Sequence, residues 1–386
     1  MNRYLISGVA PGKGGVGALV KSLDDRKYPF NYNPLYVRNP KVSATGSSAE
    51  VIASLLKNGK IAKFIYESVL FLCSLIYVQL RILTMYGNTV ILIYPQYFNS
   101  FVLTKLVKNN DVALYVMDNS FFCIKSNNYL EGQECMKCID GISNIDKSCS
   151  PLSKISSTRS AIDKIEKLKS ISPHMHFLAQ NYQQFILLKK TFGDRVRGSI
   201  VGMTTEESYN QTIVSKKHGY DIVFHGSNYD FKGVMYVLEL AKHLKQYSFL
   251  LPISPNVKQI EYPNVHFEEC TWSTGLKEFT ANARLVLCPS IYSSPVEGSL
   301  LKSIAYNGNV AVYDNDFGFQ NEIDSNALLR LNSDISFSCG VIDEFIKSKR
   351  DMSLSAKGWL KSYVSNLNDK NIFEWNLSGD HNNIDS

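Results

Sequence analysis

The sequence predicts an α/β protein of two domains, each built on a parallel sheet that is covered by helices. Short apolar runs that suit buried strands alternate with helical patterns through the first half of the chain. The same alternation starts again at residues 221–225. With 386 residues, the chain is long enough for two domains that each bury a core. We place the first domain at residues 1–195, the second at 196–355, and C-terminal helices at 356–386.

A glycine-rich loop follows the first predicted strand, which covers residues 4–9. The loop reads Gly12-Lys13-Gly14-Gly15-Val16-Gly17 and leads into a helical pattern. Gly14 and Gly15 let a backbone turn approach an anion at the helix start. The loop resembles the phosphate-binding loop of ParA-like ATPases, but Ala18 and Leu19 stand where that loop needs Lys and then Ser or Thr. A plain glycine turn between strand and helix is the other alternative.

One apolar segment, residues 64–83, is long enough to cross a bilayer. It contains Glu67 and Arg81, which are costly in hydrocarbon, so we predict a helix that covers the sheet instead. Three basic residues precede it and would allow a peripheral contact with an acidic membrane surface, namely Lys57, Lys60 and Lys63.

The predicted strand at residues 111–117 is followed by Asp118. Ligands of parallel sheets bind at the carboxyl ends of the strands, so this carboxylate is a candidate for positioning a substrate. In the alternative interpretation, Asp118 only caps a turn.

The loop at residues 119–157 holds four cysteines, Cys123, Cys135, Cys138 and Cys149. Cys135 and Cys138 have the C-x2-C spacing of a zinc knuckle, and four thiolates can complete a tetrahedral site. We therefore predict a structural zinc, with four unligated thiols as the alternative.

The second domain opens with the strand at residues 221–225 and the segment Gly226-Ser227-Asn228-Tyr229-Asp230-Phe231-Lys232-Gly233. A lysine at a helix start beyond the carboxyl end of a strand suits a diphosphate. We predict that Lys232→Ala lowers turnover severely and leaves the fold intact. The alternative is a surface lysine near a helix end.

Residues 283–312 form a pattern of strand, loop, helix and strand. Ser294, Pro295 and Glu297 predict the helix start, as the N-cap, the first helical residue and the partner in a capping box. The backbone N–H groups that would then bind a diphosphate belong to Gly298, Ser299 and Leu300. The Glu297 carboxylate could accept from hydroxyls of a sugar or ribose, or it could only close the capping box.

These segments resemble those of family 4 retaining glycosyltransferases of the GT-B type. That family has a glycine-rich loop after the first strand, His-Asp at the end of a later strand, and Gly-Arg-x4-Lys-Gly at the start of the second domain. The positions that match it here are Gly14, Gly15, Asp118, Gly226, Lys232 and Gly233. Met117 replaces the His, and Ser227 replaces the Arg. The family also has one glutamate in the loop before the last of these helices and a second on that helix, where this sequence has Ser294 and Lys302. Lys302 would then face a phosphate instead of a ribose hydroxyl.

The resemblance implies two Rossmann-like domains that face each other across a cleft, with residues 356–386 crossing back to the first. It implies retaining transfer of a sugar from a nucleotide-diphosphate sugar to a hydroxyl of a carbohydrate or lipid-linked acceptor, without a catalytic metal. The setting would be synthesis of a bacterial surface polysaccharide such as O-antigen or capsule. Asp118 and Glu297 would be the catalytic residues. The donor would be bound by Gly14, Gly15, Gly226, Ser227, Lys232, Glu297, Gly298, Ser299, Leu300 and Lys302.

Two alternatives of other kinds remain open, and the absence of both family glutamates favours the second. One is a nucleotide-sugar 2-epimerase on the same fold, and the other is a protein that binds a nucleotide sugar without consuming it.

The composition is that of an ordinary soluble globular protein, with 45% hydrophobic and 20% charged residues. A net charge of +6 suits anionic nucleotides or an acidic membrane face and does not indicate nucleic acid. No secretory signal opens the sequence, which predicts a cytoplasmic protein, with room for association with the inner face of the plasma membrane. Its eight cysteines are then expected to be reduced.

Overall fold

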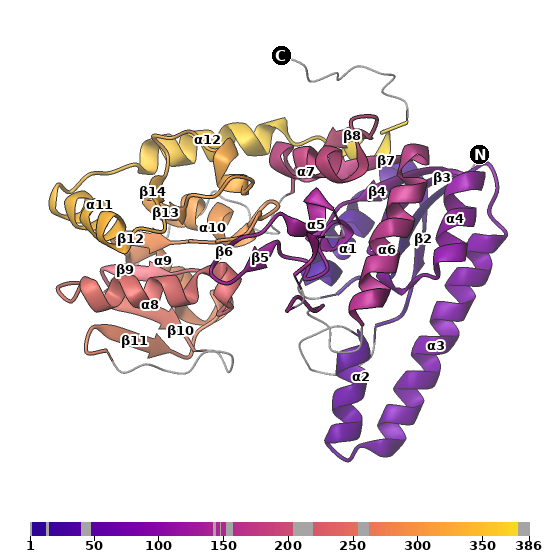
Figure 1. The fold of residues 1–386 in the computed structure, drawn as a ribbon, viewed down its shortest axis with the longest axis horizontal. Coiled ribbons are helices and arrows are strands. Elements are labelled where there is room, and N and C mark those ends of the chain that lie inside the picture. Colours follow the sequence, from indigo (N-terminus) through magenta and orange to yellow (C-terminus); the bar gives the residue numbers. More distant parts are fainter. Residues whose placement is uncertain are drawn as a thin grey trace.

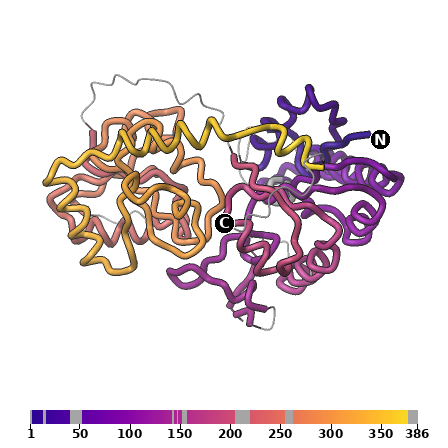
Figure 2. Tube along the Cα trace, turned by 90° about the horizontal axis from the view of Figure 1, so that it is seen from above, coloured from indigo at the N-terminus to yellow at the C-terminus, as the bar shows by residue number. Residues whose placement is uncertain are grey.

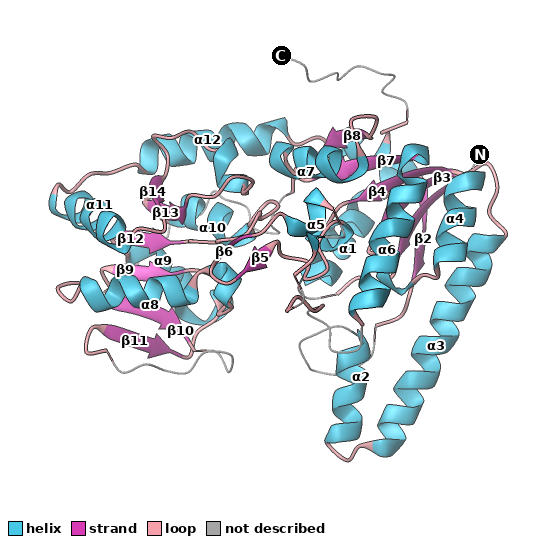
Figure 3. Ribbon diagram, in the orientation of Figure 1, coloured by secondary structure: helices cyan, strands magenta, loops and turns pink. Residues whose placement is uncertain are grey.

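The computed structural model describes residues 2–12, 15–39, 48–141, 144–146, 148–151, 157–203, 219–253 and 262–376. Gly14 therefore lies outside the described residues. Two six-stranded parallel sheets lie side by side, one in each half of the chain, and helices cover both (Figures 1 and 3).

The first sheet has the strand order β2-β1-β3-β4-β7-β8. Its strands are β1 (Arg3–Ser7), β2 (Tyr32–Tyr36), β3 (Thr89–Ile93), β4 (Asp111–Tyr115), β7 (Met175–Ala179) and β8 (Arg197–Ile200). Every residue of β3 is buried, as expected of a parallel strand covered on both faces. Because β8 pairs with β7, the first sheet continues past residue 195, where we had placed the domain boundary.

The helices of the first half are α1 (Gly15–Arg26), α2 (Ser48–Lys57), α3 (Ile61–Leu83), α4 (Ser100–Asn109), α6 (Thr158–Ile171) and α7 (Tyr182–Phe192). Alternate residues of β3 enter two separate cores, because successive side chains of a strand point to opposite faces. Val90 and Leu92 belong to one core, which also holds Phe71 and Val78 of α3. Ile91 and Ile93 belong to the other.

The second sheet has the order β11-β10-β9-β12-β13-β14, in which β9 lies between β10 and β12. Its strands are β9 (Ile222–Phe224), β10 (Phe249–Pro252), β11 (Val265–Glu268), β12 (Leu285–Leu287), β13 (Val310–Tyr313) and β14 (Leu329–Leu331). Its helices are α8 (Val234–His243), α9 (Lys277–Asn282), α10 (Gly298–Tyr306), α11 (Ile335–Lys347) and α12 (Ser353–Asn366). After β9 the chain continues to β10 on one side, and after β12 it continues to β13 on the other side. Ligands of such sheets bind at the carboxyl ends of two neighbouring strands where the order reverses in this way.

The end of the described chain returns to the first half. Figure 2 shows this segment running from the second sheet to the first. Helix α13 (Asp369–Phe373) packs there: the Tyr32 hydroxyl donates to the Phe373 carbonyl at 2.9 Å, and the Phe30 and Phe373 rings stack 4.8 Å apart. Arg26 also pairs with Asp369. These contacts hold the two halves together through the C-terminal helices.

A small hairpin of β5 (Tyr129–Leu130) and β6 (Gln133–Glu134), followed by α5 (Lys137–Asp140), lies between the two sheets (Figure 1). It belongs to the cysteine-containing loop, for which the sequence predicted no regular structure.

Candidate functional site

Two loops of the second half meet at the carboxyl ends of β9 and β12. The two strands are neighbours, and their pairing continues into the loops, because His225 N–H donates to Leu287 O at 3.0 Å. Farther along, Ile291 N–H donates to Phe231 O, also at 3.0 Å. The loop that carries Lys232 therefore lies against the loop that precedes α10.

Helix α10 begins at Gly298, with Glu297 as its N-cap residue, and no side chain caps it. The predicted capping box of Ser294, Pro295 and Glu297 is therefore wrong. The segment before the helix is held in another conformation by residues far along the chain. The Asn315 amide donates to the carbonyls of Ser290 and Tyr292, at 3.2 and 2.9 Å, and Phe319 N–H donates to Ser294 O at 3.1 Å.

Within the described residues, no side chain accepts from the backbone N–H groups of the first turn of α10. Gly298 and Ser299 are half-exposed, whereas Val296, Glu297 and Leu300 around them are buried. Backbone N–H groups at a helix start carry partial positive charge, so this turn suits an anion.

Lys232 and Glu297 form an ion pair inside this site. The Lys232 Nζ lies 2.5 Å from Glu297 Oε1, and the two side chains are only 16% and 6% exposed. Lys232 also donates to the Tyr292 hydroxyl at 3.0 Å. Burial alone would lower the pKa of Lys232, but Glu297 and Tyr292 outweigh burial and raise it, so the lysine stays charged.

Glu297 Oε1 accepts two further hydrogen bonds, from the hydroxyls of Ser290 at 2.8 Å and Ser299 at 3.1 Å. Within the described part of the chain, Oε2 of the same carboxylate accepts none. Glu297 thus closes no capping box. It is fixed through one oxygen and keeps the other for an additional donor.

Gly233 fixes the place of Lys232, because its backbone has φ +81°, which L side chains rarely adopt. A methyl group on it would also overlap the Pro289 carbonyl oxygen. Gly233→Ala is therefore expected to destabilise the protein by at least about 2 kcal/mol, measured by urea unfolding.

The matched control is Gly340→Ala, which sits inside α11 with nothing within 4 Å of the added group. This variant is expected to be more stable than the wild type by about 0.5–1 kcal/mol. Equal stabilities of the two variants would contradict the assigned role of Gly233.

The first half contributes Asp118, which follows β4. Its carboxylate accepts from Ser120 N–H at 2.9 Å, so it caps the short helix η3 (Asn119–Phe121), and burial raises its pKa. The next residue crosses to the second half, because the Asn119 amide donates to Ser293 O at 2.6 Å. Asp118 therefore lies beside the loop that precedes α10, close enough to add to the pKa of Tyr292, which burial mainly raises.

Glu134 on the β5–β6 hairpin is a site residue that the sequence did not indicate. Its carboxylate accepts from the Ser293 hydroxyl at 2.5 Å and from the N–H groups of Asp316 and Phe317, at 2.9 and 3.3 Å. No local pattern marks it, since its partners lie more than 150 residues away. The hairpin thus ties the first half to the same loop of the second.

Glu322 makes a further connection between the halves, at the start of α7, where it accepts from Gln183 N–H at 2.9 Å. Burial raises the pKa of Glu322 to about 7. A solvated Glu titrates near 4.3, so the folded state holds an extra proton between about pH 4.5 and 7. Its contribution to stability is present below this window and is lost as the pH rises through it.

Glu322→Gln keeps an acceptor oxygen and cannot ionise. The difference in Tm between this variant and the wild type is therefore expected to grow in favour of the variant from pH 5 to pH 8. Glu344→Gln, at an exposed glutamate of α11, is the control and should show no such trend. A difference that is constant with pH, or that shrinks as the pH rises, would contradict the assignment.

Of the remaining predicted donor residues, Gly226 and Ser227 lie in the same loop as Lys232. Gly15 starts α1, in the first half. Gly226 lies beside the Phe224 ring, which leaves no space for a larger residue, and Ser227 O accepts from Tyr229 N–H at 2.8 Å. Lys302 does not join the Lys232–Glu297 pair: its ammonium lies 5.0 Å from the centre of the Trp272 ring.

Trp272 in turn stacks on His225, with the ring centres 4.7 Å apart and the planes 2° from parallel. His225 bonds Ser303 Oγ through Nδ1 at 2.8 Å, and its pKa is lowered to about 3 by burial and by Lys302. The imidazole is therefore neutral, and the Lys302 ammonium lies over the Trp272 ring of this stack.

Three of the four loop cysteines, Cys123, Cys138 and Cys149, are buried in one small cluster with Ile124 and Ile165, and Cys135 is half-buried. The Cys123 and Cys138 thiols are free and share a hydrogen bond, which raises the pKa of Cys123 and lowers the pKa of Cys138. Among the described residues, no group of three or more His, Cys, Asp and Glu is arranged to hold a metal ion. The predicted zinc thus rests on sequence spacing alone.

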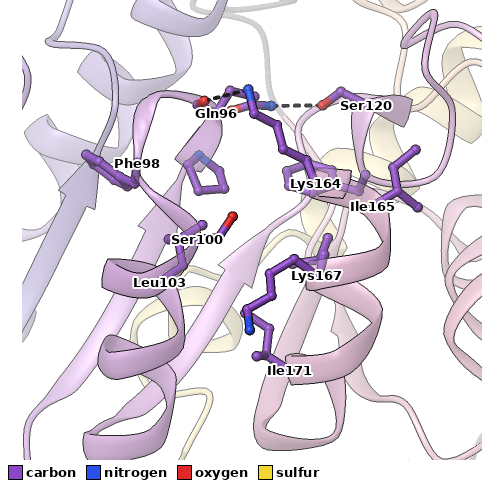
Figure 4. Close-up of a pocket in the computed structure, with 12 residues that line it drawn as sticks. Gln96, Phe98, Ser100, Leu103, Ser120, Lys164, Ile165, Lys167 and Ile171 are labelled. Atoms are coloured by element: carbon purple, nitrogen blue, oxygen red, sulfur yellow. Dashed lines mark hydrogen bonds between the residues drawn. The ribbon is translucent and has the colours of Figure 1, made fainter. Parts of the chain in front are cut away.

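A small apolar cavity of roughly 70 Å³ lies in the first half between α4 and α6 (Figure 4). It is close to the carboxyl ends of β3 and β4. At its rim, Gln96 donates to the Ser120 hydroxyl at 2.8 Å and Lys164 donates to Gln96 O at 3.2 Å. A cavity of this size accommodates a small apolar group.

A scan against protein-family models finds no match for this sequence, and no curated protein matches it. Solved structures do match. Sucrose-phosphate synthase from Thermosynechococcus elongatus aligns over 97% of both chains, with a TM-score of 0.61 and 12% identity. Anabaena HepE, solved in complex with UDP, aligns over 97% of this chain and 98% of its own, with a TM-score of 0.56 and 10% identity.

WaaG, a glycosyltransferase involved in lipopolysaccharide biosynthesis, aligns over 97% of this chain and 98% of its own, with a TM-score of 0.55 and 13% identity. The chain spans 54% of the length of Staphylococcus aureus TarM, with a TM-score of 0.46. The chain therefore has the GT-B fold of two Rossmann-like domains, as the sequence predicted.

Proposed function

We propose that this protein is a glycosyltransferase that moves a sugar from a nucleotide-diphosphate sugar to a hydroxyl of a carbohydrate or lipid-linked acceptor. The observation that carries the proposal is the uncapped first turn of α10. It lies beyond the carboxyl end of β12, where the two halves of a GT-B fold meet through Asn119 and Ser293. A diphosphate there would be bound by N–H groups to which no side chain of the described residues is bonded.

The reaction needs stabilisation of the negative charge that develops on the leaving diphosphate. The helix start supplies part of it, and Lys232, paired with the N-cap residue Glu297, supplies a largely buried cation. Lys232 is already paired with Glu297, so a bound diphosphate would share the ammonium with that carboxylate. Glu297 Oε2 would then accept from a hydroxyl of the transferred sugar.

The acceptor would approach from the first half. Asp118 lies on that side of the loop. Burial raises the pKa of its carboxyl group above that of a solvated aspartate. We assign it the positioning of the acceptor or the sugar. The cavity between α4 and α6 is a candidate for an apolar group of the acceptor.

Three finer proposals follow from the resemblance to family 4 enzymes. The anomeric configuration of the sugar would be retained, the transfer would need no divalent metal, and the product would be a surface polysaccharide made on the cytoplasmic side. The structural likeness to WaaG is in keeping with the last of these.

The test starts with a panel of UDP-, GDP-, ADP- and dTDP-sugars screened by thermal shift. The sugar that stabilises the protein most is then incubated with and without lipid-linked and oligosaccharide acceptors, and the nucleoside diphosphate and the products are measured. Release of nucleoside diphosphate that depends on an acceptor, with a new glycoside, is expected. NMR of the anomeric proton then decides retention.

The same experiment separates the alternatives. An epimerised sugar formed without acceptor would indicate a 2-epimerase, and binding without consumption would indicate a non-catalytic protein. Magnesium-dependent ATP hydrolysis would instead support the ATPase reading of the glycine loop.

A further inference from the structure

Helix α3 carries a row of aliphatic side chains that nothing in the described structure covers. Its members are spaced four, four, three, four and four residues apart, so they form one continuous face. They are Ile61, Ile65, Val69, Leu72, Ile76 and Leu80, and each is more than half exposed. Tyr66 and Tyr77, also more than half exposed, flank this row. We call the six residues the aliphatic stripe.

The opposite face of α3 belongs to the core of the first half. Phe71, Val78 and Ile82 are buried against the sheet there. Glu67 on the same side is 3% exposed and lies 3.2 Å from the Arg38 guanidinium. By length and composition α3 could cross a membrane, the one described helix that could, and only 17% of its most apolar window is buried. Crossing a bilayer would pull Glu67 and the core residues off the sheet, which is unfavourable.

The charges around the stripe have one sign. Glu67 is the single acidic residue of α3, and it is buried. The exposed charged residues at the two ends of the helix are basic: Lys57, Lys60 and Lys63 near its start, and Arg81 near its end. At the same far end, Asn99 N–H donates to Gln79 at 3.0 Å, which brings the exposed Phe101 of α4 next to α3.

We propose that α3 attaches this protein to the surface of an anionic phospholipid bilayer. The stripe enters the boundary between headgroups and acyl chains, with the helix axis along the membrane plane. The two tyrosines stand at headgroup level, and the lysines and Arg81 contact the acidic headgroups. The helix is about 35 Å long, so the contact extends over many lipids.

Charge decides between this occupant and a second copy of the chain. A second copy would bring further basic groups of the same kind, whereas acidic headgroups neutralise them. Figure 1 also shows α2 and α3 projecting together beyond the rest of the first half, where a flat surface can reach them.

The test is co-sedimentation with vesicles of phosphatidylcholine alone or with 30% phosphatidylglycerol, on the full chain. We expect the wild type to sediment with the anionic vesicles, and far less with neutral vesicles or in 0.5 M salt. Leu72→Glu/Ile76→Glu is expected to weaken binding at least tenfold. Leu354→Glu, at the 89% exposed leucine of α12, is the matched control and should bind like the wild type.

A second variant, Lys57→Gln/Lys60→Gln/Lys63→Gln, keeps the stripe and removes the charge, and it is expected to lose about tenfold or more on anionic vesicles. Unchanged thermal unfolding shows that each variant is folded. The proposal is overturned if the wild type does not bind anionic vesicles, or if the double glutamate variant binds them as tightly as the wild type does. It is also overturned if light scattering shows that the wild type is a dimer and the double glutamate variant is a monomer. Retained donor binding by that variant keeps this result separate from the sugar-transfer proposal.

Discussion

Lys232→Ala is expected to lower turnover at least 100-fold and to lower stability as well. The loss of turnover follows from removal of the buried cation that pairs with the N-cap residue of the proposed diphosphate site, a kind of change that costs about 3–4 kcal/mol of transition-state stabilisation. The loss of stability follows because Glu297 would lose its ion-pair partner in a site where its side chain is only 6% exposed. Removing one partner of a buried ion pair costs about 3–5 kcal/mol. The fold is still expected to form, as the sequence predicted, but with a lower Tm.

Measurement of kcat/KM alone would therefore confuse the two effects. Lys232→Met/Glu297→Gln removes both charges together and is expected to recover most of the lost Tm while staying inactive. Urea unfolding and steady-state kinetics on both variants separate the roles. Wild-type turnover in either variant would refute the assignment of Lys232 to the leaving group.

Ser299→Glu is expected to reduce nucleoside diphosphate binding at least tenfold while the fold is kept. The new carboxylate would stand in the first turn of α10, where it repels a diphosphate and competes for the same N–H groups. Ser299 is half-exposed, so no core packing is lost.

The matched control is Ser299→Gln, which has nearly the same size without the charge. It loses the same hydroxyl contact to Glu297 and should bind within about threefold of the wild type. Isothermal titration with the stabilising nucleotide gives Kd for both. Equal Kd values for the Glu and Gln variants would show that the diphosphate lies elsewhere.

The chain's local patterns predicted both sheets, because buried parallel strands need continuous apolar runs. Residues 89–94 and 285–288 contain such runs, and β3 and β12 form within them. The sequence also placed Lys232 and Glu297 beside neighbouring strands, and these two residues do meet. It could not show that they neutralise each other, since 65 residues separate them.

Local patterns gave a wrong helix start where contacts from distant residues set the backbone conformation. Ser294, Pro295 and Glu297 have the right spacing for a helix start, yet Asn315 and Phe319 bond the loop before it and delay the helix to Gly298. No local pattern indicated the contact of Lys302 with the Trp272 ring either.

The sequence by itself determined most strands and helices of the two parallel sheets, since the hydrophobic effect acts on patterns that adjacent residues already contain. Only the tertiary structure decided which polar groups of the site are taken and which stay free. Glu134 and Glu322 join the two halves, and Glu297 holds Lys232, because a buried polar group must find a partner wherever the fold brings one within reach.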